Sequence, residues 1–274
     1  MRGISGKSAI ITGGTSGIGF ATAERLLSDG CRVLITGRNR EKGERALARL
    51  KEEYPDTESY LFIGDMGEES VCIELMKKAL ELFGSVDFLV NNAFAFTRLA
   101  WTATRWHWEH VMEAGPINYA TMIAQFYLQQ PKGHRGAIVN VSSISAFRAQ
   151  PRSWTYNSAK GAVRQLTKCA AVDLAPYIRV NSISPADVMT DEVIKLHPGI
   201  PIEELRKSKD PSHMSGVTIL PEECASAVVF LLSDDAAAIT ASDLPVDSGY
   251  MSTGPAGYPE PGLGPTLNDY VGTN

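Results

Sequence analysis

The chain has 274 residues, of which 44% are hydrophobic, and its 26 Lys and Arg against 31 Asp and Glu give a formal net charge of −5. This composition is typical of a folded globular protein and excludes disordered, collagen-like and coiled-coil chains. The acidic balance leaves no basic footprint for nucleic acid or anionic lipid, so we expect neither as a partner. The longest apolar run, residues 224–232, is only about half of what a membrane-spanning helix needs.

The cellular compartment is indicated by the cysteines and by the start of the chain. The four cysteines are scattered without a CxxC pair, and the first residues contain no apolar stretch long enough for a signal peptide. This pattern favours buried thiols in a reducing cytoplasm over disulfides or a zinc site. The histidines show no metal-ligand spacing either, so no metal is expected.

Short β-branched runs alternate along the chain with longer amphipathic stretches. The predicted strands are residues 8–12, 32–36, 59–63, 86–90, 137–141, 179–183 and 243–246. The predicted helices are residues 17–29, 41–54, 68–83, 156–175 and 221–232, with a long helical region over 102–130 that is interrupted at Gly115-Pro116. Strict alternation predicts βαβ crossovers, and the strands are apolar throughout. We therefore expect an α/β fold: a doubly wound parallel sheet of about seven strands with helices on both faces.

The chain shows no internal repeat and no linker, which predicts one domain over residues 1–250. Two segments fall outside the alternation of strands and helices. Residues 187–219 carry several prolines, and residues 251–274 form a tail rich in Pro and Gly. The tail has too few apolar groups to fold by itself.

A glycine-rich turn, TGGTSGIG at residues 12–19, lies between the first predicted strand and the first predicted helix. Glycines at such a place allow a tight turn and a close approach of the backbone to a pyrophosphate, whose charge rests on the helix N-terminus. The spacing is G-x-x-x-G-x-G rather than G-x-G-x-x-G, and an ordinary strand-to-helix turn is the alternative. The position after the first strand of an alternating chain favours a dinucleotide site.

The residues after the second predicted strand bear on the choice of dinucleotide. An acidic residue there would bind the ribose hydroxyls of NAD, but the chain has Gly37-Arg38-Asn39-Arg40. The planar guanidinium of Arg38 suits a 2′-phosphate, and no carboxylate is expected nearby to repel one. We expect NADP(H), with NAD(H) possible; the alternative is a solvated arginine that begins a helix.

Tyr156 and Lys160 are four residues apart, which places a phenol and an ammonium on one helix face. Such a pair is easily found by chance on a surface. Ser143, thirteen residues before Tyr156, ends a predicted strand. Taken with the glycine turn, with Asn91-Asn92-Ala93 and with NSISP at residues 181–185, the order of these motifs resembles the short-chain dehydrogenase/reductase family over nearly all of residues 5–250.

The resemblance implies a Rossmann-type fold and a catalytic role for Ser143, Tyr156 and Lys160. Tyr156 would be the general acid/base, and Ser143 would hydrogen-bond the substrate oxygen. A phenol ionises near pH 10, so action near pH 7 asks for about 3 units of pKa, or about 4 kcal/mol, of phenolate stabilisation. Lys160 would supply part of it and would hold the nicotinamide ribose. The residues implied to bind the cofactor are Gly13, Thr15, Ser16, Gly17, Ile18, Gly19, Arg38, Asn39, Asp65, Met66, Asn92, Ala93, Tyr156, Lys160, Pro185, Ala186, Val188 and Thr190.

The chain departs from the family pattern at several places, of which three bear on the site. Phe94 follows Ala93 where the family usually has glycine, and Ala186 follows Pro185 where the family again has glycine. The family's fourth catalytic residue, an asparagine in the long middle helix, aligns with Gly115, and Asn118 lies one turn away. Either carbonyls at the Gly-Pro break or Asn118 would then bind the water that the family asparagine holds; we favour the carbonyls.

The substrate side is expected to be mainly apolar, with walls from Phe94, Phe96, Trp101 and Trp154. A cyclic, secondary alcohol or ketone fits such a pocket better than a sugar. Residues 187–219 occupy the place of the family's substrate lid, and by resemblance the protein is a homodimer or homotetramer. Two alternatives stay open: an isomerase, dehydratase or enoyl reductase on the same fold, or a catalytically silent cofactor-binding sensor or scaffold.

Overall fold

The computed structural model describes residues 1–195, 197–209, 213–216 and 218–252. The Pro/Gly-rich tail predicted from residue 251 therefore lies outside the described residues except for its first two positions. Over the described ranges, no helix is both long enough and apolar enough to span a membrane.

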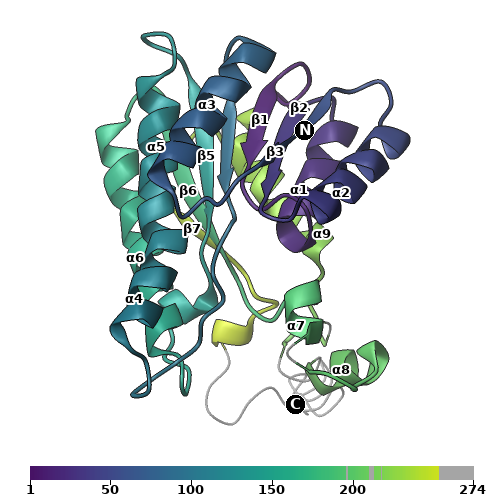
Figure 1. Cartoon of the computed structure of the whole chain (residues 1–274), viewed down its shortest axis with the longest axis vertical. Helices are drawn as coiled ribbons and strands as arrows, with labels where there is room; N and C mark the ends of the chain where they lie inside the picture. The colour runs from purple at the N-terminus through teal and green to yellow at the C-terminus, as the bar shows by residue number, and fades with distance from the viewer. Residues whose placement is uncertain (196, 210–212, 217, 253–274) are drawn as a thin grey trace, which may run out of the picture.

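The described residues contain one seven-stranded sheet in which every neighbouring pair is parallel, with the order β3-β2-β1-β4-β5-β6-β7. The strands are β1 Ser8–Ile11, β2 Arg32–Gly37, β3 Ser59–Ile63, β4 Phe88–Asn91, β5 Gly136–Val141, β6 Ile178–Pro185 and β7 Asp243–Val246. Both the parallel sheet and its position between helices confirm the predicted doubly wound fold (Figure 1). The chain order reverses between β1 and β4, and the carboxyl ends of these two strands open a crevice where such sheets bind ligands.

Two layers of helices cover the sheet because its strands are apolar on both faces. One face packs on α1 Gly17–Ser28, α2 Arg40–Glu53 and α9 Pro221–Leu232, and the other packs on α3 Glu69–Phe83, α5 Asn118–Leu128 and α6 Trp154–Asp173. Side chains alternate between the two cores along a strand: Ile11 of β1 belongs to the first and Ile10 to the second. Three further helices, α4 Arg105–Met112, α7 Asp191–Lys195 and α8 Ile202–Lys209, complete the described set.

The long middle helix is broken where the sequence predicts. A π-helical turn, Glu113–Ile117, joins α4 to α5, and Gly115 within it has φ −123° and ψ −107°, outside the helical range. Pro116 has no N–H to continue the hydrogen-bond ladder, and π-turns of this kind are a recognised cause of helix kinks. The kink is buried at Gly115 and Pro116 beside α6.

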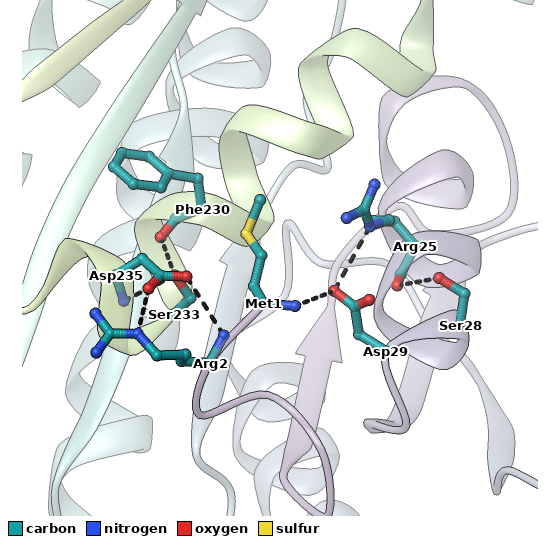
Figure 2. Close-up of polar contacts among 8 residues, drawn as sticks. All are labelled: Met1, Arg2, Arg25, Ser28, Asp29, Phe230, Ser233 and Asp235. Carbon is teal, nitrogen blue, oxygen red and sulfur yellow. Dashed lines mark hydrogen bonds and ion pairs between the residues drawn. The ribbon is translucent and has the colours of Figure 1, made fainter.

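The segment before β1 is held by polar contacts at both sides, as Figure 2 shows. The amino group of Met1 lies 3.3 Å from an Asp29 carboxylate oxygen at the end of α1, and Arg25 approaches the same oxygen at 3.5 Å. Arg2 binds Asp235, beyond α9, with Nε 2.5 Å from Oδ1. These contacts tie the N-terminus to the layer of α1 and α9, away from the carboxyl ends of the strands.

The segment at residues 187–219 contains structure that the periodicity does not predict. It holds the two short helices α7 and α8, and Val188 bridges Ile219 in parallel. In Figure 1 both helices lie below the sheet, beyond the end of β6 that leads into them. The segment therefore borders the crevice at the carboxyl ends of the strands.

Candidate active site

A cleft of about 560 Å³ runs along the carboxyl ends of the strands. The glycine turn lines one end of the cleft, and α6 lines the other. Most of the residues proposed from the sequence to bind a cofactor line it: Gly13, Thr15, Ser16, Gly17, Ile18, Arg38, Asp65, Met66, Asn92, Ala93, Tyr156, Lys160, Pro185, Ala186, Val188 and Thr190. Gly19 and Asn39 do not line it: Gly19 is buried under the turn, and Asn39 caps α2 by accepting a hydrogen bond from the Lys42 N–H at 2.8 Å.

Two glycines of the turn, Gly13 and Gly19, lie too close to neighbouring atoms to carry a side chain. Gly13 has φ +64°, and a Cβ there would lie 3.0 Å from both Asn92 Nδ2 and the Ala93 Cα. A Cβ on Gly19 would overlap the Gly13 carbonyl oxygen. Asn92 fixes the turn because its Nδ2 donates to the carbonyls of Thr12 and Gly13, both at 3.0 Å.

The start of α1 is suited to an anion. Its N-terminal cap, Ser16, makes no side-chain hydrogen bond to the helix, and the first turn of α1 contains no acidic residue. The first N–H groups of a helix have no partner within it, and the helix dipole favours negative charge there. A dinucleotide pyrophosphate therefore fits the glycine turn, which lines the cleft.

Arg38 lines the same cleft, but a carboxylate lies beside it. Its Nη1 is 3.6 Å from Asp65 Oδ2, and both side chains are about half exposed or more. The sequence-based argument that no carboxylate is near Arg38 is therefore wrong in space. Asp65 follows β3, which pairs in parallel with β2, so the carboxyl ends of the two strands bring the residues together. An exposed ion pair of this kind contributes little free energy and leaves the guanidinium accessible.

Ser143 and Tyr156 face the cleft from β5 and α6. Ser143 follows β5 and caps the short 3₁₀ turn Ile144–Ala146, where its Oγ accepts from the Ser145 N–H at 3.1 Å. Tyr156 lies in the first turn of α6, which begins at Trp154, two residues earlier than predicted. The Ser143 hydroxyl interacts with the phenol of Tyr156 and lowers its pKa. A hydroxyl and a phenol are therefore presented together at one end of the cleft.

Lys160 is buried behind Tyr156, with 3% of its surface exposed. Its Nζ donates a 2.8 Å hydrogen bond to the Val141 carbonyl at the end of β5 and lies 5.7 Å from the centre of the Tyr156 ring. The predicted spacing of four residues thus places both side chains on one face of α6, confirming that geometric prediction.

Burial shifts the proton affinities of both groups. It raises the pKa of Tyr156 to about 12, while hydrogen bonding with Ser143 and the charge of Arg98 oppose the rise. It lowers the pKa of Lys160 to about 7. A base that works near neutral pH needs a lowered phenol pKa, whereas the pKa of Tyr156 is raised, opposite to the predicted shift. The physical reason is desolvation, which disfavours the phenolate. Burial disfavours the Lys160 ammonium as well, and this ammonium points to Val141.

Two of the four aromatic side chains proposed to form the substrate wall line the cleft. Phe94 and Phe96 lie edge-on to the Tyr156 ring, with centroid distances of 5.5 and 4.9 Å. Trp101 and Trp154 are instead 74% and 54% exposed, pack against each other, and are not part of the cleft lining. They lie on the loop after β4 and at the first residue of α6, and that placement depends on the loop path, which periodicity does not predict.

Sequence reasoning missed several residues at the site, among them Arg98, Thr97 and His110. Arg98 acts electrostatically on the Tyr156 phenol and hydrogen-bonds Ser153 through Nε at 2.9 Å. Thr97 and His110 line the cleft. All three lie between β4 and the middle of the broken helix, where the sequence carries no motif. The one sequence signal in this region was the aromatic cluster around Phe94 and Phe96.

Comparisons with known proteins cover most of the chain. A family described as enoyl-(acyl carrier protein) reductase matches residues 13–251. The NADP-dependent (R)-specific alcohol dehydrogenase of Lentilactobacillus kefiri is 32% identical over 256 residues, which cover 91% of this chain and 98% of that protein. The chain belongs to the short-chain dehydrogenase/reductase family. The cyclopentanol dehydrogenase of a Comamonas species is 31% identical over 92% of this chain and its own full length. The crystal structure of levodione reductase superposes with a TM-score of 0.84, at 27% identity over 91% of this chain and 99% of that one.

As a short-chain dehydrogenase/reductase, the protein is an oxidoreductase that acts on CH–OH groups with NAD(P) as acceptor. The observed cleft is consistent with that class because it joins an anion-binding glycine turn to a phenol, a hydroxyl and a buried ammonium. The NAD(P) class of cofactor therefore follows from the family.

The place of the family's fourth catalytic residue is occupied differently here. Gly115 contributes no side chain, and Asn118, one turn on, points into the second core, where its Oδ1 accepts from the Cys72 thiol at 3.3 Å. Asn118 is 2% exposed and does not line the cleft. Its contact with Cys72 indicates that it joins α5 to α3.

Replacing Asn118 is therefore expected to affect packing more than turnover. We predict that Asn118→Ala lowers kcat less than tenfold, or less than about 1.4 kcal/mol in barrier height. Steady-state kinetics of ketone reduction at saturating cofactor measure the effect, and a thermal melt separates the packing loss. A hundredfold fall in kcat with unchanged cofactor affinity and unchanged melting would make Asn118 the fourth catalytic residue.

Proposed function

We propose that the protein is an NADP(H)-dependent oxidoreductase that interconverts a secondary alcohol and a ketone on a mainly apolar, cyclic substrate. One observation carries the proposal: Ser143, Tyr156 and Lys160 lie at one end of a cleft whose other end is the glycine turn with Arg38. Proton transfer at a carbonyl oxygen and tight dinucleotide binding are the two requirements of that reaction, and the cleft supplies both.

Each of the three residues has a separate task. When bound, the dinucleotide supplies the hydride acceptor or donor. Tyr156 gives its proton to the carbonyl oxygen in reduction and takes it back in oxidation, because its phenol faces the cleft. Ser143 hydrogen-bonds the same oxygen as negative charge develops there. Lys160, held by Val141, places a positive charge next to the phenol, which favours the phenolate.

The apolar, cyclic substrate is supported by the wall of the cleft and by the relatives. Phe94 and Phe96 flank Tyr156 with their rings, so the reacting carbon would sit against aromatic surface. Two proteins similar to this chain are a cyclopentanol dehydrogenase and levodione reductase. A compact ring with a carbonyl or hydroxyl group fits such a wall better than a charged chain.

The choice of NADP(H) is supported by Arg38. It lines the cleft with its guanidinium two-thirds exposed, and its one polar partner among the described residues is Asp65, at 3.6 Å. A bidentate bond to a phosphate is stronger than such a surface pair, so a 2′-phosphate would replace the Asp65 contact. One relative of 32% identity is also NADP-dependent.

Removing the Arg38 guanidinium tests this choice. We predict that Arg38→Ala weakens NADPH binding by about 1.5–3 kcal/mol and leaves NADH binding nearly unchanged, because only the 2′-phosphate loses its charged partner. Dissociation constants come from quenching of tryptophan fluorescence. Arg40→Ala is the matched control, since Arg40 is exposed, pairs with Glu44 at 3.7 Å and does not line the cleft. An equal loss for both cofactors, or a wild type that prefers NADH, contradicts NADP(H).

The remaining parts of the molecule fit the proposal in two ways. Residues 187–219 border the cleft through Val188, Thr190 and Val193, as a substrate lid would. Large apolar side chains are exposed along α5 and α6, with Leu128 at 70% and Val172 at 73%. We propose that these helices form the interface of a cytoplasmic homodimer or homotetramer.

A substrate screen tests the proposal as a whole. The purified protein is offered cyclic ketones with NADPH or NADH, and cyclic secondary alcohols with NADP⁺ or NAD⁺, while absorbance at 340 nm is followed. Turnover of cyclic secondary alcohols and their ketones, faster with NADP(H), is the expected result. Binding of NADPH without turnover of any compound would instead favour a sensor or scaffold.

A further inference from the structure

The pair Phe94 and Gly115 departs from the family pattern at two positions that the structure brings into contact. A Cβ built on Gly115 would lie 2.5 Å from Phe94 Cε2 and 3.0 Å from Cζ. Real Cβ atoms do not approach a ring carbon so closely, so no side chain at position 115 can coexist with the ring as placed. The two departures are therefore one structural change: the ring at 94 fills the volume that a side chain at 115 would use.

The same ring touches the catalytic pair. Its face lies toward the Lys160 ammonium, with Nζ 3.6 Å from the ring centre, and its edge packs on Tyr156 at a centroid distance of 5.5 Å. Tyr119 of α5 also packs edge-to-face with the Phe94 ring, at a centroid distance of 6.4 Å. The ring of Phe94 thus lies against the kink, the ammonium and the phenol at once.

The ring supplies what a buried ammonium otherwise lacks. Among the described residues, the one hydrogen-bond acceptor that the Lys160 Nζ reaches is the Val141 carbonyl at 2.8 Å. An aromatic face attracts a cation through its quadrupole, and that attraction is strongest where water is excluded, as it is around this 3%-exposed side chain. The Val141 carbonyl and the Phe94 ring therefore stabilise the charged form together.

We propose that Phe94 is a positioning residue for Lys160, with Gly115 as the position that makes room for it. On this view the ring replaces a water held at the helix kink: it favours the charged form of Lys160 against the cost of burial and directs the ammonium beneath Tyr156. The expectation that carbonyls at the Gly115-Pro116 break hold a water next to Lys160 is then replaced, because the ring packs against both the break and the ammonium. This inference rests on the proposed function only for the role of Lys160 in turnover.

A shape-matched substitution separates the ring's electrostatics from its bulk. Fluorination depletes the negative face of the ring with little change in size, so 3,4,5-trifluorophenylalanine at position 94 is expected to lower kcat about tenfold, and Phe94→Leu about tenfold to thirtyfold. KM for the ketone changes less than kcat. If Phe94 were only a wall of the substrate pocket, Phe94→Leu would raise KM and the fluorinated ring would behave as wild type. That result would overturn the proposal.

Proton binding by Lys160 gives a readout that needs neither cofactor nor turnover. The ¹³C resonance of its ε-carbon, assigned by its loss in Lys160→Met, is followed against pH in the cofactor-free protein. Tyr156 is the titratable neighbour of Lys160 on α6, and the charged or titratable groups that interact with Tyr156 are Tyr119 on α5, Arg98 after β4 and Asp187 after β6. Losing the ring removes a contact of the charged form, so the midpoint is expected to fall by at least half a pH unit in Phe94→Leu. An unchanged midpoint contradicts the proposal even where the enzyme is fully active.

The contact between positions 94 and 115 is tested by a double-mutant cycle. Gly115→Ala displaces the ring and is expected to lower kcat about tenfold in the wild-type background, but less than twofold in the Phe94→Ala background. Equal losses in both backgrounds would assign the effect to the backbone at the kink and overturn the pairing. If wild type turns over no alcohol or ketone, the proposed function fails, while the Lys160 titration still decides the role of Phe94.

Discussion

Tyr156→Phe is expected to lower kcat for ketone reduction by about a thousandfold, or about 4 kcal/mol in barrier height. The substitution removes only the oxygen that transfers the proton. The ring contacts with Phe94 and Phe96 stay, and the fold around α6 does not depend on the hydroxyl. NADPH affinity is therefore expected to remain within about threefold of wild type.

The measurement pairs steady-state kinetics at 340 nm with a fluorescence titration of NADPH on the same preparation. Tyr177→Phe is the matched control, since Tyr177 is 45% exposed and lies past the far end of α6. If Tyr156→Phe kept wild-type turnover on a substrate found in the screen, the phenol would not be the acid, and another group at the cleft would have to be sought.

Lys160→Met is expected to lower kcat/KM a hundredfold or more, because the phenolate loses the positive charge beneath it. Methionine keeps the unbranched apolar stem of the side chain and is one heavy atom shorter, so most of the volume behind Tyr156 stays filled. Lys168→Met on the exposed side of the same helix is the control. Activity within tenfold of wild type would show that Lys160 is a structural residue.

The same variant gives a pH signature of stability. Burial lowers the pKa of Lys160 from its ordinary 10.5 to about 7, so between these values the unfolded chain binds more protons than the folded one. Stability from this group therefore rises with pH across that window. Lys160→Met lacks this dependence, and its free energy of unfolding relative to wild type is expected to fall by about 2 kcal/mol between pH 7 and pH 9. Parallel denaturation curves at the two pH values would contradict the burial of a titrating amine.

The fold was predictable because its signal repeats along the chain. Every predicted strand is present, since apolar runs bounded by turn signals place buried parallel strands directly. The glycine turn and the spacing of Tyr156 and Lys160 were equally direct, because both depend on residues close in sequence. The kink at Gly115 followed from the Gly-Pro pair alone.

What the sequence did not predict depends on contacts between distant segments. The Arg38–Asp65 pair needs β2 and β3 side by side, and the contact of Phe94 with Gly115 and Lys160 needs three elements to meet. The raised pKa of Tyr156 follows from burial, which no motif reports. The exposed positions of Trp101 and Trp154 depend on the path of the loop after β4.

The position of a transferred label tests the central claim most directly. Wild-type protein is given 2-cyclohexenone and NADPH carrying deuterium at the transferable position of the nicotinamide, and the product is examined by NMR. Reduction at the carbonyl, with Tyr156 giving its proton to the oxygen, predicts an allylic alcohol with deuterium on the carbon that bears the hydroxyl. Deuterium on the ring carbon β to an intact carbonyl would instead show an enoyl reductase and contradict an alcohol/ketone oxidoreductase.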